Sequence, residues 1–338
     1  MIFEPTHRKL LFHIGHHKTG TTTIQNAFAT RRVILDDVRI LYPGRLAHNY
    51  LRRHFKSFLT EGRLLPGKPG FPGLATIAER LQRGNFNVAV LSGEAFEGSE
   101  PSGVLKVLSA FMLPHVSDHA VICYIRPHAG RILSSYAECL KIGQFSGDVD
   151  EFAQNVITDG RWHYARRMDE WVKVFGTHFC LRPMIRTELA GGSVLADFVA
   201  TGLGPDAPVK FESVAWANES LCLEDLVLAR LVQVSLRLRQ PHLRVAMGWE
   251  LAATFGSAAR AGTSCTKLML HRALAERIRV AYREDAERMD ATYFRGRSLF
   301  RAELDRAVDE ALPKAQSLDP ADHFNSERMM KEHQLRNG

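Results

Sequence analysis

One stretch near the N-terminus, KLLFHIGHHKTGTTTIQ at residues 9–25, limits the fold of this chain more than any other. Its apolar run from Leu10 to Ile14 predicts a buried strand, and an apolar pattern of helical period begins at Thr23. The residues between them include two glycines, a lysine and several threonines. Because glycine permits sharp turns, backbone N–H groups converge in such a loop at the positive end of the helix dipole. The stretch predicts a strand, an anion-binding loop and a helix.

The position of the lysine separates this loop from the Walker A loop of nucleotide triphosphatases. In GxxxxGK[ST] the lysine follows the second glycine, whereas Lys18 precedes Gly20 by two residues. The run KTGTT resembles the 5′-phosphosulfate loop of bacterial sulfotransferases that use 3′-phosphoadenosine 5′-phosphosulfate (PAPS). The resemblance implies that PAPS is bound by the residues of this loop, namely Gly15, His17, Lys18, Thr19, Gly20, Thr21 and Thr22.

A second motif, YIRPHAGRILSSYAECLKIG at residues 124–143, follows an unbroken apolar run. Arg126 ends the strand expected at 119–127, and Ser134 comes eight residues later in the next helix. A helix that folds back along the sheet can bring these two side chains together. The pair resembles the motif with which PAPS sulfotransferases bind the 3′-phosphate, so the resemblance assigns Arg126 and Ser134 to that group.

The remaining apolar pattern predicts an α/β fold. The runs at 87–94 and 119–127 lack alternation, which is typical of strands buried on both faces of a parallel sheet. Further strands are expected at 38–43 and 178–189, and helices at 74–83, 104–112, 148–176 and through most of 221–300. The resemblance implies a P-loop-like parallel β-sheet flanked by helices, with a largely helical C-terminal part. We expect a single domain over residues 1–312, with a polar extension over 313–338.

Glu94 ends the expected strand 87–94, where residues face the ligand crevice of an open α/β sheet. Four residues are candidates for the base that takes a proton from the acceptor: Glu94, His13, His16 and His17. His13 lies within the first strand, where a core or sheet-face role is the alternative, and a helix-capping or arginine-paired structural role is the alternative for Glu94. The predicted catalytic residues are Lys18, Glu94 and His16. Arg182 and Arg186, in a later passage that also resembles these enzymes, either line the site or form structural ion pairs.

Charge and cysteine content indicate which binding partners and which cellular compartment to expect. A net charge of +7 and a pI near 9.3 favour an anionic partner, but the basic residues of segment 31–68 show no aromatic interleaving or zinc-ligand spacing, so nucleic acid is not expected. The five scattered cysteines are typical of reduced thiols. With neither an export signal nor a run long enough to span a membrane, we expect a cytoplasmic protein and leave peripheral membrane contact open.

The resemblance implies sulfuryl transfer from PAPS to a hydroxyl or amine, without a metal. It favours a carbohydrate or glycolipid acceptor. Two alternatives remain: a nucleotide-dependent phosphotransferase, in which the strand at 87–94 presents an acid to Mg²⁺, and a nucleotide-binding protein of the same fold that does not turn over. Neither the acceptor nor the oligomeric state can be read from the sequence.

Overall fold

The computed structural model describes residues 7–16, 19–35, 38–207, 209–211, 221–259 and 266–323. These residues group into two compact units. The first contains residues 1–127 and 164–218, and the second contains 128–163 and 219–338. The single domain expected over 1–312 stays a prediction.

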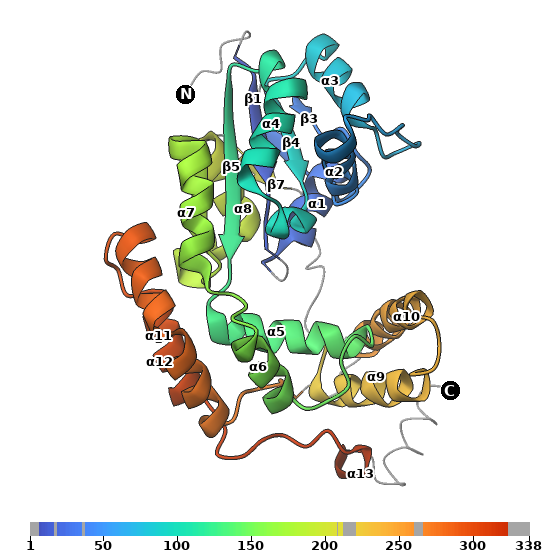
Figure 1. Cartoon of the computed structure of the whole chain (residues 1–338), viewed down its shortest axis with the longest axis vertical. Coiled ribbons are helices and arrows are strands. Elements are labelled where there is room, and N and C mark those ends of the chain that lie inside the picture. The colour runs from blue at the N-terminus through green and yellow to red at the C-terminus, as the bar shows by residue number, and fades with distance from the viewer. Residues whose placement is uncertain are drawn as a thin grey trace. The chain divides into compact units, whose positions relative to one another are not determined.

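The first unit is built on a five-stranded parallel sheet with the strand order β3-β4-β1-β5-β6 (Figure 1). The strands are β1 (Lys9–His13), β3 (Ile40–Leu41), β4 (Val88–Ser92), β5 (Asp118–Ile125) and β6 (Phe179–Pro183). β1 is the central strand and pairs with β4 on one side and β5 on the other. The predicted parallel sheet flanked by helices is confirmed.

Helices cover both faces of this sheet because β1 is apolar on both sides. Leu11 packs in a cluster with residues of α1 (Thr21–Ala29) and α8 (Val194–Leu203), while Phe12 stacks on Phe55 and meets Phe96 edge to face. The second face carries α2 (Leu51–Glu61), α3 (Leu74–Arg83), α4 (Pro101–Phe111) and α7 (Tyr164–Phe175). α8 approaches β1 closely, because a Cβ at Gly202 would lie 2.6 Å from Cδ1 of Leu11.

Several boundaries differ from those expected. The predicted strand 38–43 shortens to β3, and the predicted helix 148–176 is two helices, α6 (Val149–Thr158) and α7, separated by a turn at Gly160. The helix α2 and a small antiparallel sheet of β2 (Val33–Leu35) and β7 (Val209–Phe211) were not expected. Short 3₁₀ helices complete the unit, namely Glu94–Gly98, Leu113–His115, Gly176–His178, Arg186–Glu188 and Ala190–Gly192.

The second unit is helical in its described part. Its helices are α5 (His128–Lys141), α6, α9 (Leu223–Ser235), α10 (Pro241–Ala259), α11 (Arg272–Tyr293), α12 (Phe300–Asp309) and α13 (Pro320–His323). A buried pair joins α5 to α11, with Nε2 of His128 2.9 Å from Oδ2 of Asp285. The Asp290 carboxylate accepts the backbone N–H groups of Phe300 and Arg301, which fixes the start of α12. The helical C-terminal part is therefore confirmed over these residues.

The cysteines depart from the expectation. Cys123, Cys139 and Cys180 are free thiols, but Cys222, buried at the start of α9, is disulfide-bonded. The expectation of reduced thiols throughout is therefore wrong at Cys222, and the cytoplasmic localisation stays a prediction. In the described part of the chain, no helix combines the length and apolar character needed to cross a bilayer.

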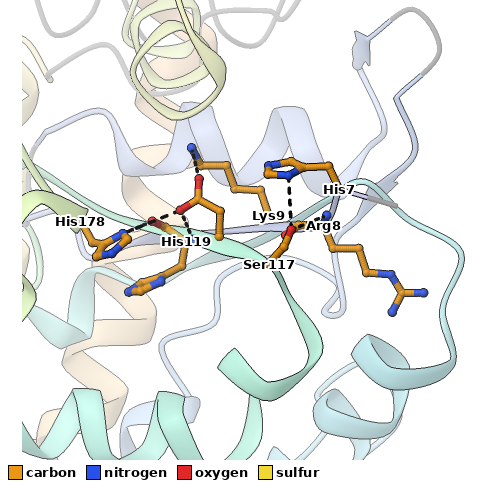
Figure 2. A network of polar contacts seen from close by, with 7 residues as sticks. His7, Arg8, Lys9, Ser117, His119 and His178 are labelled. Atoms are coloured by element: carbon orange, nitrogen blue, oxygen red, sulfur yellow. Dashed lines mark hydrogen bonds and ion pairs between the residues drawn. The ribbon is translucent and has the colours of Figure 1, made fainter. Parts of the chain in front are cut away.

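A polar network closes the amino-terminal edge of the sheet (Figure 2). Nζ of Lys9 lies 2.8 Å from Oδ2 of Asp118, and the rings of His119 and His178 stack with their centroids 4.0 Å apart. Burial would raise the pKa of Asp118, but the hydrogen bond and charge of Lys9 outweigh it and lower that pKa. Asp118, His119 and His178 have the spacing of metal ligands, yet Lys9 already neutralises the carboxylate.

A buried carboxylate holds β6 and α8 in place beside β5. Asp197, in the first turn of α8, accepts hydrogen bonds from Nε and Nη2 of Arg182, from the hydroxyl of Tyr124 at 2.7 Å and from the backbone N–H of Ala190. These bonds raise the pKa of Arg182, where the hydrogen bond to Asp197 is the largest cause. The Asp197 carboxylate thus provides a hydrogen-bond acceptor for each of these donors.

We expect Asp197→Ala to lower the free energy of unfolding by about 3 kcal/mol, because it leaves the buried end of Arg182 and the Tyr124 hydroxyl without their acceptor. Urea denaturation measures this change. Asp159→Ala, which removes an exposed Asp–Arg pair in the second unit, is the control and should cost less than about 0.5 kcal/mol. Equal costs for the two variants would contradict the anchoring role.

Candidate functional site

The loop between β1 and α1 is shaped by Gly20. This residue precedes the first residue of α1 with φ at 75°, in the left-handed region that glycine occupies without steric cost. A Cβ there would also lie 3.0 Å from Cγ1 of Val194 at the start of α8. No side chain in the described part of the chain caps α1, and the N–H of Thr23 donates to the Gly20 carbonyl at 3.0 Å, so the N–H groups of Thr21 and Thr22 are the first-turn donors that could face a ligand. The predicted strand and helix are confirmed, and anion binding by the loop between them stays a prediction.

The start of the loop continues the pairing with β5. The backbone N–H of Ile14 donates to the carbonyl of Ile122 at 3.0 Å, and that of His16 donates to Tyr124 at 3.2 Å. Thr19 is buried, and its hydroxyl donates to the carbonyl of His16 at 2.6 Å. Its hydroxyl therefore holds the loop together. His17 and Lys18 lie outside the described residues.

Glu94 lies beside the start of this loop. The backbone N–H of Gly93 donates to the carbonyl of His13 at 2.9 Å, so the chain leaving β4 is held against the end of β1. Glu94 is the next residue and opens the 3₁₀ helix Glu94–Gly98, with its side chain half-buried. The carboxyl edge thus brings the start of the β1–α1 loop close to the segment that carries Glu94, as the sequence predicted for neighbouring strand ends.

His48 and Asn49, which sequence reasoning missed, hold the chain before and after Glu94. The backbone N–H of Ser92 donates to Nδ1 of His48 at 3.0 Å, and that of Ala95 donates to Oδ1 of Asn49 at 3.0 Å. Both side chains come from the basic segment 31–68, to which the sequence analysis assigned no role. The only signal is a short polar run, His48 to Tyr50, before the helix α2. They give the basic segment a structural role at the carboxyl edge.

The histidines of this edge are in the core. Burial lowers the pKa of His13 to about 3, and burial also lowers the pKa of His48 to about 4 against an opposing hydrogen bond from Ser92. Nδ1 of His13 is 2.8 Å from the Ser92 hydroxyl, and a Cβ at Gly15 would lie only 2.5 Å from Nε2 of His13. His13 is a neutral packing residue under the loop, which is the alternative that its place in the strand suggested.

His16, a predicted catalytic residue, is also buried. Its Nδ1 lies 3.2 Å from Oε1 of Glu97, and its ring centroid is 5.7 Å from that of Tyr164. Arg167 of α7 donates to the carbonyls of Glu97 and Ser99, which fastens the same 3₁₀ helix. His16 thus faces this helix and α7, whereas Glu94 is half-buried.

The residues of the second motif belong to different units. Arg126 directly follows β5 in the first unit, where its carbonyl accepts the Tyr164 hydroxyl at 3.0 Å. Ser134 lies in α5 of the second unit and donates to the carbonyl of Arg131 at 3.1 Å. Of the two arginines left open between site and ion pair, Arg182 is paired with Asp197, and Arg186 is exposed.

Comparisons with known proteins give only a distant structural similarity. The sequence matches no known protein family, and no curated protein matches it. Among solved structures, the chain is similar to a sulfotransferase from Alicyclobacillus acidocaldarius, with 14% sequence identity and a TM-score of 0.44. The match covers 89% of this chain and 100% of that one. At this distance the similarity carries no argument about activity, which has to be made from the residues themselves.

The buried histidines predict how stability depends on pH. In the unfolded chain a histidine has a pKa near 6.5. Below pH 6.5 the unfolded chain therefore binds protons at His13 and His48, while these buried side chains stay neutral in the folded chain. The free energy of unfolding should therefore fall as pH falls from 6.5 toward about 4, by up to about 1.4 kcal/mol per pH unit for each histidine.

Urea denaturation between about pH 7 and pH 4.5 measures this slope. His48→Gln should give a shallower slope than the unsubstituted protein, whereas His242→Gln, at an exposed position of α10, should leave the slope unchanged. If both variants keep the full slope, His48 does not carry the effect.

Proposed function

We propose that this chain is a sulfotransferase that moves the sulfuryl group of PAPS to a hydroxyl or amine of an acceptor. The observation that carries the proposal is the loop between β1 and α1, with its left-handed Gly20, uncapped helix start and neighbouring Glu94. The sequence adds a lysine two residues before Gly20, which is the spacing of a phosphosulfate loop rather than of a triphosphate loop.

The reaction is an in-line displacement. An acceptor oxygen or nitrogen forms a bond to sulfur while the bond between sulfur and the 5′-phosphate oxygen breaks, leaving adenosine 3′,5′-bisphosphate. Sulfuryl transfer resembles phosphoryl transfer in that positioning and charge neutralisation provide most of the rate. Negative charge grows on the leaving oxygen, and the N–H groups at the start of α1 would stabilise it there.

Each predicted residue has a role in this scheme. The loop residues Gly15 to Thr22 would bind the 5′-phosphosulfate, and Lys18 would neutralise the leaving oxygen. Arg126 and Ser134 would bind the 3′-phosphate. Glu94 would take the acceptor proton, and its half-buried position supports it over the buried His16. No role in this scheme is assigned to a metal.

The acceptor is proposed to be a carbohydrate or glycolipid, which agrees with the net positive charge of the chain if the glycan is acidic. A phosphotransferase is the rival activity, because an acid after β4 could bind Mg²⁺ beside the loop. The two differ in ligand: a phosphotransferase would bind MgATP, whereas the proposed enzyme would bind adenosine 3′,5′-bisphosphate.

Lys18→Ala should lower kcat by about 10²–10³ and affect nucleotide affinity much less, because the ammonium acts mainly on charge that develops in the transition state. Turnover is measured as release of adenosine 3′,5′-bisphosphate from PAPS in the presence of mixed glycans and glycolipids. Lys56→Ala, in the basic segment, is the control and should turn over normally. Near-normal turnover of the Lys18 variant would remove this residue from the mechanism.

Glu94→Gln should fold and bind adenosine 3′,5′-bisphosphate but lose about 10²–10⁴ in kcat, together with the acidic limb of the pH–rate profile. The amide keeps the shape of the carboxyl group and cannot accept the proton. Glu100→Gln, at an exposed residue before α4, is the matched control. If Glu94→Gln turns over normally, or loses its fold rather than its rate, the base must be sought among the loop histidines.

A further inference from the structure

The second unit carries an exposed apolar and basic surface on the hairpin of α9 and α10, which we call the hairpin surface. Its exposed apolar residues are Leu231, Val234, Leu238, Leu243 and Met247, whereas Trp249 of α10 packs against Nζ of Lys141 at the end of α5. Leu231 and Val234 are three residues apart on one face of α9, and Leu238, in the turn that follows the helix, is 93% exposed. Isolated exposed leucines are common, but a gathered set of this size marks an interaction surface.

The hairpin is held firmly at its base. Buried Gln233 of α9 donates from Nε2 to the carbonyls of Lys141 at 2.9 Å and Arg244 at 2.8 Å, which joins α5, α9 and α10. Gly248 allows α10 to pack directly on α5, because a Cβ there would lie 2.3 Å from the Lys141 carbonyl oxygen. α9 and α10 lie side by side (Figure 1). Because the inner faces pack on each other and on α5, the apolar residues opposite them are left exposed.

The charge of the hairpin surface has one sign. Between Asp225 and Glu250 the sequence has no acidic residue, and it has four arginines, namely Arg230, Arg237, Arg239 and Arg244. Arg230 and Arg244 donate to backbone carbonyls of the same unit. Arg237 and Arg239 flank Leu238 at the turn and are exposed. The surface therefore needs an occupant that is both apolar and anionic.

A second copy of this chain does not meet that need. A twofold dimer would place the hairpin surface against itself, and arginines would then face arginines with no carboxylate between them. An anionic lipid bilayer offers both features, since phosphates lie directly above an apolar layer. We propose that the hairpin surface docks on anionic lipid bilayers, with Leu238 inserted between headgroups and Arg237 and Arg239 on lipid phosphates. This docking does not depend on the proposed sulfuryl transfer.

Flotation with vesicles tests the proposal on the full chain without nucleotide. The protein should float with phosphatidylcholine vesicles that contain about 30% phosphatidylglycerol and should remain unbound with phosphatidylcholine alone. Raising NaCl from about 0.05 M to 0.5 M should release it, because the headgroup attraction is screened. Absence of flotation with the anionic vesicles at low salt would overturn the proposal.

Matched variants locate the binding surface. Leu238→Ser should lower vesicle partitioning at least about tenfold, and Arg237→Ala with Arg239→Ala about thirtyfold. Val280→Ser is the control: Val280 is 77% exposed on α11 of the same unit, next to Arg279, which is paired with Glu276 and Asp305. Its partitioning should not change.

Other outcomes have clear meanings. Binding that persists in Leu238→Ser would overturn insertion of the hairpin turn. Equal, salt-dependent binding of single-stranded RNA, lost in the same variants, would make the surface a nucleic-acid site and overturn the lipid assignment. A dimer in solution that Leu238→Ser converts to a monomer would show that a second copy covers the surface, which also overturns it.

Discussion

The pairing of β1 with β4 and β5 is the constraint on which the rest of the first unit depends. The two ladders continue past the strands, through the Gly93 N–H to the His13 carbonyl on one side and the His16 N–H to the Tyr124 carbonyl on the other. The loop that follows is therefore held at both sides before it turns at Gly20 into α1. If this loop binds an anion as proposed, the pairing of residues 14–16 and the turn at Gly20 hold its two ends in place beforehand, which is the preorganisation that electrostatic stabilisation requires.

The same pairing explains why buried histidines lie under the loop. A neutral imidazole can form a hydrogen bond with one ring nitrogen and pack its flat ring against aromatic neighbours. His48 accepts from the backbone N–H of Ser92, His13 is hydrogen-bonded to the Ser92 hydroxyl, and both rings pack against aromatic side chains. The resulting low pKa values make this support sensitive to acid. The β4 exit that carries Glu94 is thus fixed from three directions: by β1, by the His48–Asn49 turn and by Arg167 of α7.

The local pattern of apolar residues predicted several strands and helices of this fold. The apolar runs around Leu10, Val90 and Ile122 are buried strands because a central parallel strand has no polar face, and the limits of α3 agree with the expected 74–83. Leu51 and Phe55 do have helical spacing in α2, but the arginines and histidine around them hid it.

Long-range partners could not be predicted: β2 pairs with β7 across more than 170 residues of sequence, with three residues in each strand. Local pattern also could not predict the contacts of His48, Asn49 and Arg167 or the disulfide at Cys222. The roles of Lys18, Arg126 and Ser134 rest on motif spacing and stay predictions.

Ligand-dependent thermal stability is the measurement that tests the central claim most directly. A ligand that binds only the folded chain raises its stability by RT ln(1 + [L]/Kd), so the three nucleotides adenosine 3′,5′-bisphosphate, AMP and MgATP can be ranked under one set of conditions. The account predicts a clear rise in Tm with adenosine 3′,5′-bisphosphate and a much smaller one with AMP, because only the former carries the 3′-phosphate. MgATP should have little effect. A larger rise with MgATP, or an equal rise with AMP, would contradict the assignment of this chain as a PAPS-dependent sulfotransferase.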